Sequence, residues 1–309
     1  MEKYKIWLDC DTGIDDAIAI ITALKLPCIE IVGASAVAGN AYLRYTFPNT
    51  RNVFSLAGRE DIKVYKGADR PLFRPYTPPE FHKANGLGNA VIPESKAPVE
   101  TKSAYEALYE KAVELNGELT VIAIGPLTNI AITIASHPDI VKLIKKLVIM
   151  GGGVAEGNIT PCAEFNIICD PDAAEAVFKS GIEIVMCGLD VTHKTRMTGE
   201  VIDEIYSYGN AVGKLLYDST LLVQEFHNSG NRAINLHDSC TFMYLAYPEL
   251  FKAYHCGVYV ETQGTITLGK TVCDLYSDHK FEDRHCTVVM DVDNDKFIQI
   301  TKDIYKSYQ

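Results

Sequence analysis

The chain has 309 residues, and its 40 acidic side chains outnumber its 29 basic ones, which gives a formal net charge of −11. That charge disfavours nucleic acid as a partner, because such binding depends on Lys and Arg side chains that neutralise phosphates. Hydrophobic residues at 47% and charged residues at 22% are ordinary for a globular enzyme, and the apolar run 17–24 is too short to span a bilayer. We therefore expect a cytoplasmic protein that binds neither nucleic acid nor membrane.

From the N-terminus, apolar strand-like runs alternate with helical patterns. The predicted strands are 4–8, 29–36, 119–124, 146–150 and 182–187, and the predicted helices are 15–26, 42–57, 103–116, 127–135 and 171–180. Farther on we expect two or three helices in 198–236, a small hairpin or edge element in 262–275, a last strand at 286–292 and a helix from Asp295. Repeated strand-then-helix units predict an α/β fold with an open, mostly parallel sheet flanked by helices. Because no linker interrupts the sequence, we expect one domain, 1–309.

Unusual residues follow four of the predicted strands. An acidic run occupies 9–16, a Gly-Asn pair 39–40, a Gly-Pro pair 125–126 and three glycines 151–153. In parallel α/β sheets, ligands bind beyond the carboxyl ends of the strands. We expect the active site at that edge, and the long polar loops 67–100 and 188–196 are candidate lids.

The acidic run holds four carboxylates within eight residues, those of Asp9, Asp11, Asp15 and Asp16. A helix cap needs only one Asp, and four like charges at this spacing repel one another. A hard divalent cation with oxygen ligands is the simplest compensation. An EF-hand is excluded, because the acidic residues do not alternate and the chain continues into an apolar helix.

Two types of enzyme could place these carboxylates after a first strand. Magnesium-dependent phosphohydrolases of the haloacid dehalogenase type use the first Asp of an Asp-x-Asp pair as nucleophile, here Asp9. Their usual Thr two residues beyond the second Asp is Gly13 in this chain. The second type matches at every position, since Asp-x-Asp-Thr-Gly-x-Asp-Asp-Ala-Ile-Ala resembles the signature of the inosine-uridine preferring nucleoside hydrolases.

This resemblance covers nearly the whole chain, in the family's order. It continues through Val-Ala-Gly-Asn at 37–40, Gly-Pro-Leu-Thr-Asn at 125–129, Met-Gly-Gly-Gly at 150–153, Glu-Gly-Asn at 156–158, Ala-Glu-Phe-Asn at 163–166 and His-Asp at 237–238. It implies a nucleoside hydrolase-like fold and calcium-dependent hydrolysis of the N-glycosidic bond of ribonucleosides to ribose and free base. A preference for inosine and uridine, or for pyrimidines, is expected.

The resemblance also implies roles for individual residues. One Ca²⁺ ion would be bound by the carboxylates of Asp11, Asp16 and Asp238 and by the main-chain carbonyl of Ile124. Asp11 would be the general base on a metal-bound water, and His237 the general acid, a role suited to an imidazole that titrates near neutrality. The substrate-binding positions would be Asp15, Asn40, His82, Met150, Asn158, Glu164 and Asn166.

The resemblance also bears on base specificity and on assembly. In the family, the base is read by the helix that precedes His-Asp, predicted here at 215–227 with Gln224, Glu225, Phe226 and His227. The loop around His82 departs from the family's pattern at Lys83 and Asn85. A nucleoside- or ribose-binding protein without catalysis is an alternative, although binding alone needs neither a base nor an acid. Relatives are commonly oligomers, which implies a homodimer or homotetramer, and a role in nucleoside salvage.

Overall fold

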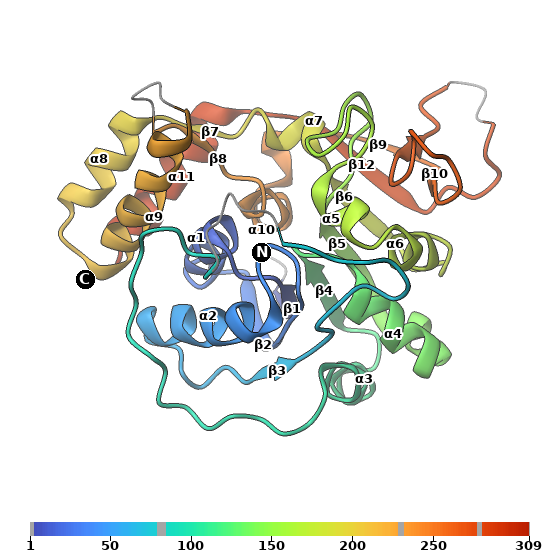
Figure 1. Cartoon of the computed structure of the whole chain (residues 1–309), viewed down its shortest axis with the longest axis horizontal. Coiled ribbons are helices and arrows are strands. Elements are labelled where there is room, and N and C mark those ends of the chain that lie inside the picture. The colour runs from blue at the N-terminus through green and yellow to red at the C-terminus, as the bar shows by residue number, and fades with distance from the viewer. Residues whose placement is uncertain (1–2, 79–84, 228–231, 277–279, 309) are drawn as a thin grey trace.

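An eight-stranded sheet forms the centre of the molecule (Figure 1). The computed structural model describes residues 3–78, 85–227, 232–276 and 280–308. The strands lie in the order β3-β2-β1-β4-β5-β6-β12-β9, and all neighbours run parallel except the antiparallel pair β12 and β9. Their bounds are β1 (Tyr4–Cys10), β2 (Ile29–Ala36), β3 (Val64–Lys66), β4 (Leu119–Ala123), β5 (Ile144–Met150), β6 (Ile184–Cys187), β9 (Phe251–Cys256) and β12 (Cys286–Val292). The predicted open, mostly parallel α/β sheet is confirmed.

Helices cover both faces of this sheet. One face packs against α1 (Ile14–Ala23), α2 (Leu43–Leu56), α8 (Gly199–Ser207), α9 (Ala211–His227), α10 (Ser239–Ala246) and α11 (Asn294–Lys306). The other face packs against α3 (Ala104–Leu115), α4 (Thr128–Ser136) and α6 (Pro171–Phe178). No helix in the described ranges is long and apolar enough to cross a membrane.

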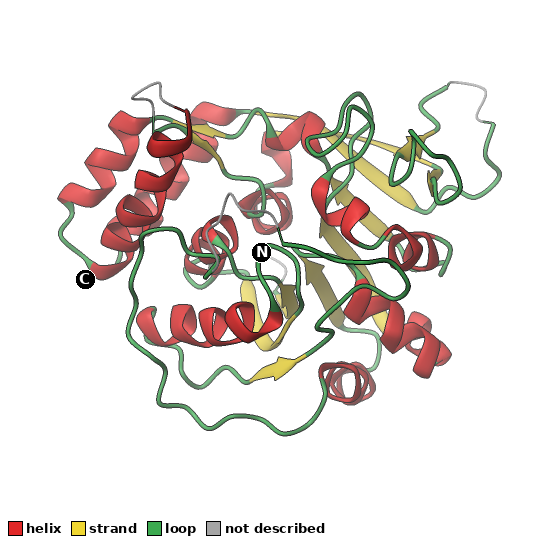
Figure 2. Cartoon of the chain, in the orientation of Figure 1, coloured by secondary structure: helices red, strands yellow, loops and turns green. Residues whose placement is uncertain are grey.

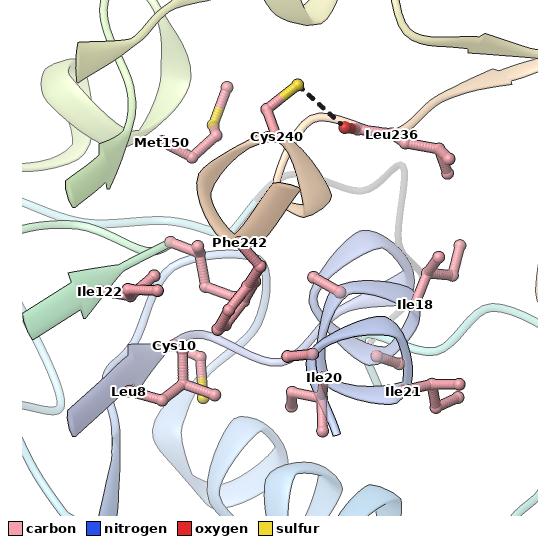
Figure 3. Packing of buried hydrophobic residues seen from close by; sticks show 14 of the residues in the cluster. Leu8, Cys10, Ile18, Ile20, Ile21, Ile122, Met150, Leu236, Cys240 and Phe242 are labelled. Atoms are coloured by element: carbon pink, nitrogen blue, oxygen red, sulfur yellow. Dashed lines mark hydrogen bonds between the residues drawn. The ribbon is translucent and has the colours of Figure 1, made fainter. Parts of the chain in front are cut away.

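Strand residues alternate between the two cores, because successive side chains of a strand point to opposite faces. Ile122 belongs to the first core, whereas its neighbour Val121 belongs to the second. Trp7 is 1% exposed and lies in the second core, as expected for a core residue. Figure 3 shows strand residues such as Leu8 packing with the apolar side chains of α1 and with Phe242 of α10.

The order of the strands places a crevice at the carboxyl ends of β1 and β4. These two strands are neighbours, but the helix after β1 covers one face of the sheet and the helix after β4 covers the other. The two chain segments therefore diverge beyond the strand ends, and α/β sheets bind ligands at such a point. The acidic run follows β1, and Ile124 follows β4 directly.

Several elements were not predicted, or lie outside their predicted range. The short strand β3 and the edge strand β9 were missed, and most of β9 is exposed, so it lacks an apolar alternation. The predicted hairpin at 262–275 supplies only β11 (Thr271–Cys273), which pairs with the earlier β10 (Val258–Val260). The segment 198–236 forms two helices and β8 (Ile234–Asn235), a partner of β7 (Arg196–Met197). The described parts of 67–100 are almost all loop (Figure 2).

Candidate active site

Asp16 closes the turn between β1 and α1. Its Oδ1 accepts the backbone N–H of Asp11 at 3.1 Å, and its Oδ2 accepts the N–H of Gly13 at 3.0 Å and the side-chain amide of Asn40 at 3.0 Å. Such bonds satisfy backbone donors that a helix start leaves free, at the end of the helix that favours negative charge. Asp16 therefore holds the acidic turn in shape as well as contributing a charge to it.

Asp11 lies in a narrow backbone cradle. Its Oδ2 accepts the backbone N–H of Asn40 at 2.6 Å, whereas its buried Oδ1 has no hydrogen-bond partner. A Cβ atom on Gly39 would lie 2.0 Å from Oδ2, and one on Gly125 would lie 2.8 Å from Oδ1. Only glycine fits at both positions. The cradle leaves one carboxylate oxygen of Asp11 free for a ligand.

The His-Asp motif at 237–238 folds back onto the acidic run. The backbone N–H of Asp238 donates to Asp15 Oδ2 at 3.0 Å, a contact between residues 223 positions apart in the chain. The other oxygen of Asp15, Oδ1, is buried without a partner. The structure therefore brings together the two motifs that the sequence places at opposite ends of the chain.

These carboxylates lie close together in the interior, and their pKa values are raised. Burial, and then the charge of Asp16, raises the pKa of Asp11 well above its ordinary value. Burial likewise raises the pKa of Asp15 to about 8, and burial followed by the nearby carboxylates raises that of Asp238 strongly. Within the described residues, neither Lys nor Arg contributes to these shifts. A bound cation would favour the ionised forms.

Asp9 lies within β1, next to the acidic turn, and is fully buried. Its Oδ1 accepts the amide of Asn129 at 2.7 Å and the hydroxyl of Ser35, which in turn accepts the indole N–H of Trp7 at 2.8 Å. Burial raises the pKa of Asp9 to about 7. An inaccessible carboxyl group with these bonds is poorly placed to attack a phosphate.

Asn166 joins the ends of two central strands. Its side-chain amide donates to the carbonyl of Ile124 at 3.0 Å and to that of Met150 at 3.1 Å. Glu164 caps α5 (Phe165–Cys169), because its carboxylate accepts the N–H groups of Asn166, Ile167 and Gly152. Asn158 Oδ1 accepts the N–H of Phe165 at 2.9 Å. These predicted sugar ligands thus also shape the cavity wall.

His237 is held by Thr192, whose Oγ1 lies 2.7 Å from its Nδ1. Burial, and then the neighbouring His193, lowers the pKa of His237 to about 4. Both effects shift this pKa away from the neutral range that the sequence suggested for His237. The lowered pKa favours the uncharged imidazole, which can donate from one ring nitrogen.

A cavity of about 580 Å³ opens above these groups. Nine of the predicted site residues line it: Asp15, Asn40, Ile124, Met150, Asn158, Glu164, Asn166, His237 and Asp238. Asp11 and Asp16 are fully buried, and Asn40, which lines the cavity, bonds to both. His82 and the side chains of Gln224, Glu225, Phe226 and His227 lie outside the described residues.

Some cavity residues were not predicted. His193 and Asn235 line the same cavity, as do Ile159 and Phe165. His193 lies in the loop proposed as a lid, one residue after Thr192, and only the fold shows that it faces His237. Asn235 lies in a two-residue strand that no periodicity could reveal.

Residues 6–299 match the family described as inosine-uridine preferring nucleoside hydrolase. The chain belongs to this family. Our nucleoside hydrolase is 39% identical to the pyrimidine-specific ribonucleoside hydrolase RihA of Photobacterium profundum, over 98% of this chain and 99% of the relative. It is equally similar to the RihA of Escherichia coli, strain ED1a, over 98% of each chain.

Solved structures of nucleoside hydrolases share this fold. A plant nucleoside hydrolase superposes with a TM-score of 0.91 at 30% identity, over 98% of this chain and 99% of that one. The purine-preferring ribonucleoside hydrolase from Gardnerella vaginalis superposes with a TM-score of 0.90 at 30% identity, over 98% of each chain. The nucleoside hydrolase-like fold is therefore shown, together with the activity of an enzyme that cleaves nucleosides.

The donor chemistry of the site fits a metal ion of the kind implied by the resemblance. In the described part of the chain, no three His, Cys, Asp or Glu side chains are already grouped as a metal site. Asp16 in particular directs both carboxylate oxygens to hydrogen-bond donors. The buried, unpartnered Oδ1 of Asp11 and the uncompensated neighbouring carboxylates nevertheless suit a hard cation with oxygen ligands.

Proposed function

We propose that this nucleoside hydrolase is a calcium-dependent enzyme that cleaves pyrimidine ribonucleosides to ribose and free base. The observation that carries the proposal is the unpartnered oxygen of Asp11, buried beneath a cavity whose walls hold hydrogen-bonding side chains and His237. The pyrimidine preference is supported by the 39% identity to relatives named pyrimidine-specific. That identity exceeds the 30% shared with the purine-preferring enzyme.

In this proposal, Asp11 is the general base for the attacking water. Its free oxygen can accept the water proton. Positive charge develops on the ribosyl ring as the N-glycosidic bond breaks, and the surrounding carboxylates stabilise that charge. A calcium ion held by Asp11, Asp16, Asp238 and the Ile124 carbonyl would supply the charge that keeps these carboxylates ionised.

His237 would assist departure of the base as a neutral hydrogen-bond donor. The hydroxyl of Thr192 can donate to Nδ1, which leaves the proton of the uncharged ring on Nε2. Nε2–H can then donate to the base as it accumulates negative charge. This differs from donation by an imidazolium, which the lowered pKa of His237 disfavours.

The two alternatives are less well supported. A phosphohydrolase needs Asp9 in the cavity, but Asp9 bonds to Ser35 and Asn129, which do not line the cavity. Asp11, in contrast, bonds to Asn40, which does line it. A non-catalytic binding protein would not need the free oxygen of Asp11. Cytoplasmic location, a role in salvage, a single domain over 1–309 and assembly as a homodimer or homotetramer stay predictions.

The test is a reducing-sugar assay with uridine, cytidine, inosine, adenosine and guanosine, with and without a calcium chelator. We expect ribose release to be fastest with uridine and cytidine, to fall with the chelator, and to be lost in Asp11→Ala while the fold is retained. His237→Ala should lose most activity with the poorest leaving bases. The hydrolase proposal fails if the wild type releases ribose from none of these nucleosides, and the pyrimidine preference fails if purine nucleosides are cleaved faster.

A further inference from the structure

The short helix α7 (Leu189–Thr192) follows β6 (Figure 1), and the residue after it, His193, lines the cavity. Its first backbone N–H, of Leu189, donates to the carbonyl of Gly152 at 2.9 Å. The carboxylate of Asp190 accepts the N–H groups of Val154 at 2.6 Å and Ala155 at 3.0 Å. The loop after β5 is therefore tied to α7 directly before Glu156.

This tie places Glu156 beside His193, which follows α7. Glu156 Oε1 lies 2.9 Å from His193 Nδ1. A carboxylate can only accept a hydrogen bond, so Nδ1 must carry a proton, and in the neutral ring Nε2 is then an acceptor. The side chains of His193 and Glu156 are 36% and 62% exposed, and an exposed pair of this kind contributes little to stability. A role of this pair in the cavity, which His193 lines, is therefore more plausible than a role in stability.

The neighbouring imidazole, that of His237, can present a hydrogen-bond donor. The ring of His237 lies 5.7 Å from that of His193, at an angle of 72°. Its Nδ1 is bound to Thr192 Oγ1, and with the hydroxyl as donor its Nε2 carries the proton. With these tautomers, the consecutive residues Thr192 and His193 hold a hydrogen-bond donor near an acceptor in the lining of the cavity.

A uracil ring carries the matching pair of groups, a carbonyl at O2 next to an N–H at N3. We propose that His193 is a specificity-determining residue, whose Nε2 accepts the N3–H of a uracil-type base while His237 donates to O2. This rests on the proposed function, because it takes the end of the cavity near His237 as the site of the base. Cytosine has an acceptor at N3, so it would leave the His193 acceptor unpaired, which an active site penalises.

The test compares uridine with 3-methyluridine, in which a methyl group replaces the N3 hydrogen. The wild type should prefer uridine by at least about tenfold in kcat/KM, because the methyl group removes the N3–H donor and also collides with the acceptor on His193. In His193→Ala that preference should fall to about threefold or less, mainly through slower uridine cleavage. The uridine-to-cytidine preference should fall in the same variant.

Two further variants separate recognition from a structural role. His193→Gln keeps a carbonyl acceptor and should retain part of the preference, and Glu156→Ala should weaken it by a smaller factor, about twofold or less. The matched control is His255→Ala on β9, which removes an exposed imidazole outside the cavity wall. It should leave the preference unchanged.

The outcomes distinguish this inference from the proposed function. An active, folded His193→Ala enzyme that discriminates against 3-methyluridine as strongly as the wild type would overturn the role of His193 alone. A wild-type enzyme that releases no ribose from uridine would overturn the proposed function, and the inference with it.

Discussion

Replacing Gly39 with alanine should inactivate this enzyme by displacing Asp11. The new Cβ atom would lie 2.0 Å from Asp11 Oδ2 and 2.8 Å from Cδ of Pro126. Heavy atoms in ordinary contact are about 3.5 Å apart, so the Asp11 carboxylate or the backbone must move by about 1 Å or more. The Pro126 ring is rigid, which leaves Asp11 as the group that gives way.

Gly39→Ala should lower both the stability of the fold and the rate of catalysis. The bond of 2.6 Å from the Asn40 N–H to Asp11 Oδ2 would break, and a hydrogen bond to a charged group contributes about 1.5–3 kcal/mol. Overpacking adds about 1–3 kcal/mol, so the free energy of unfolding should fall by about 2.5–6 kcal/mol. A catalytic group misplaced by about 1 Å can cost about 100-fold in rate, and we expect at least that loss in kcat.

Ribose release from uridine measures the activity, and urea unfolding measures the stability. The matched control is Gly199→Ala at the start of α8, where the nearest atom to a new Cβ is 3.7 Å away. It should keep full activity and gain up to about 1 kcal/mol, because alanine favours a helix over glycine. The reasoning about Asp11 is refuted if folded Gly39→Ala keeps kcat within about threefold of the wild type.

Three further predictions concern the cation, the pH and the core. Ca²⁺ at about 100 times its dissociation constant should stabilise the fold by about 2.7 kcal/mol in thermal unfolding, and a shift as large in Asp16→Asn would contradict the proposed ligand set. Burial raises the pKa of Glu164 to about 7, so its contribution to stability is complete below pH 4.5 and is lost as the pH rises through 7; the loss is about 3 kcal/mol. Urea unfolding should show that the wild type loses more stability than Glu164→Gln between pH 5 and pH 8. Equal losses in the two proteins would disprove the role of Glu164. Trp7→Phe removes the bond to Ser35 and should cost about 1–3 kcal/mol by urea unfolding with kcat nearly unchanged, whereas a large loss of kcat would place Trp7 in the site.

The sequence by itself determined most of the sheet, most of its flanking helices and the edge that holds the site. Apolar periodicity and turn residues are local, so the units around β1, β4 and β5 could be recognised from short windows. The acidic run and the His-Asp pair were also legible, because few structures need so many carboxylates in one turn. The exposed edge strand β9 and the two-residue strand β8 carry no such pattern and were missed.

Only the tertiary structure decided which groups are free and which face one another. Asp16 and Asp11 belong to the same run, yet Asp16 directs both oxygens to N–H donors while Asp11 keeps one without a partner. His193 looked like part of a surface loop until α7 placed it beside His237. Hydrogen-bond partners and burial depend on segments far apart in the chain, and no local pattern specifies them.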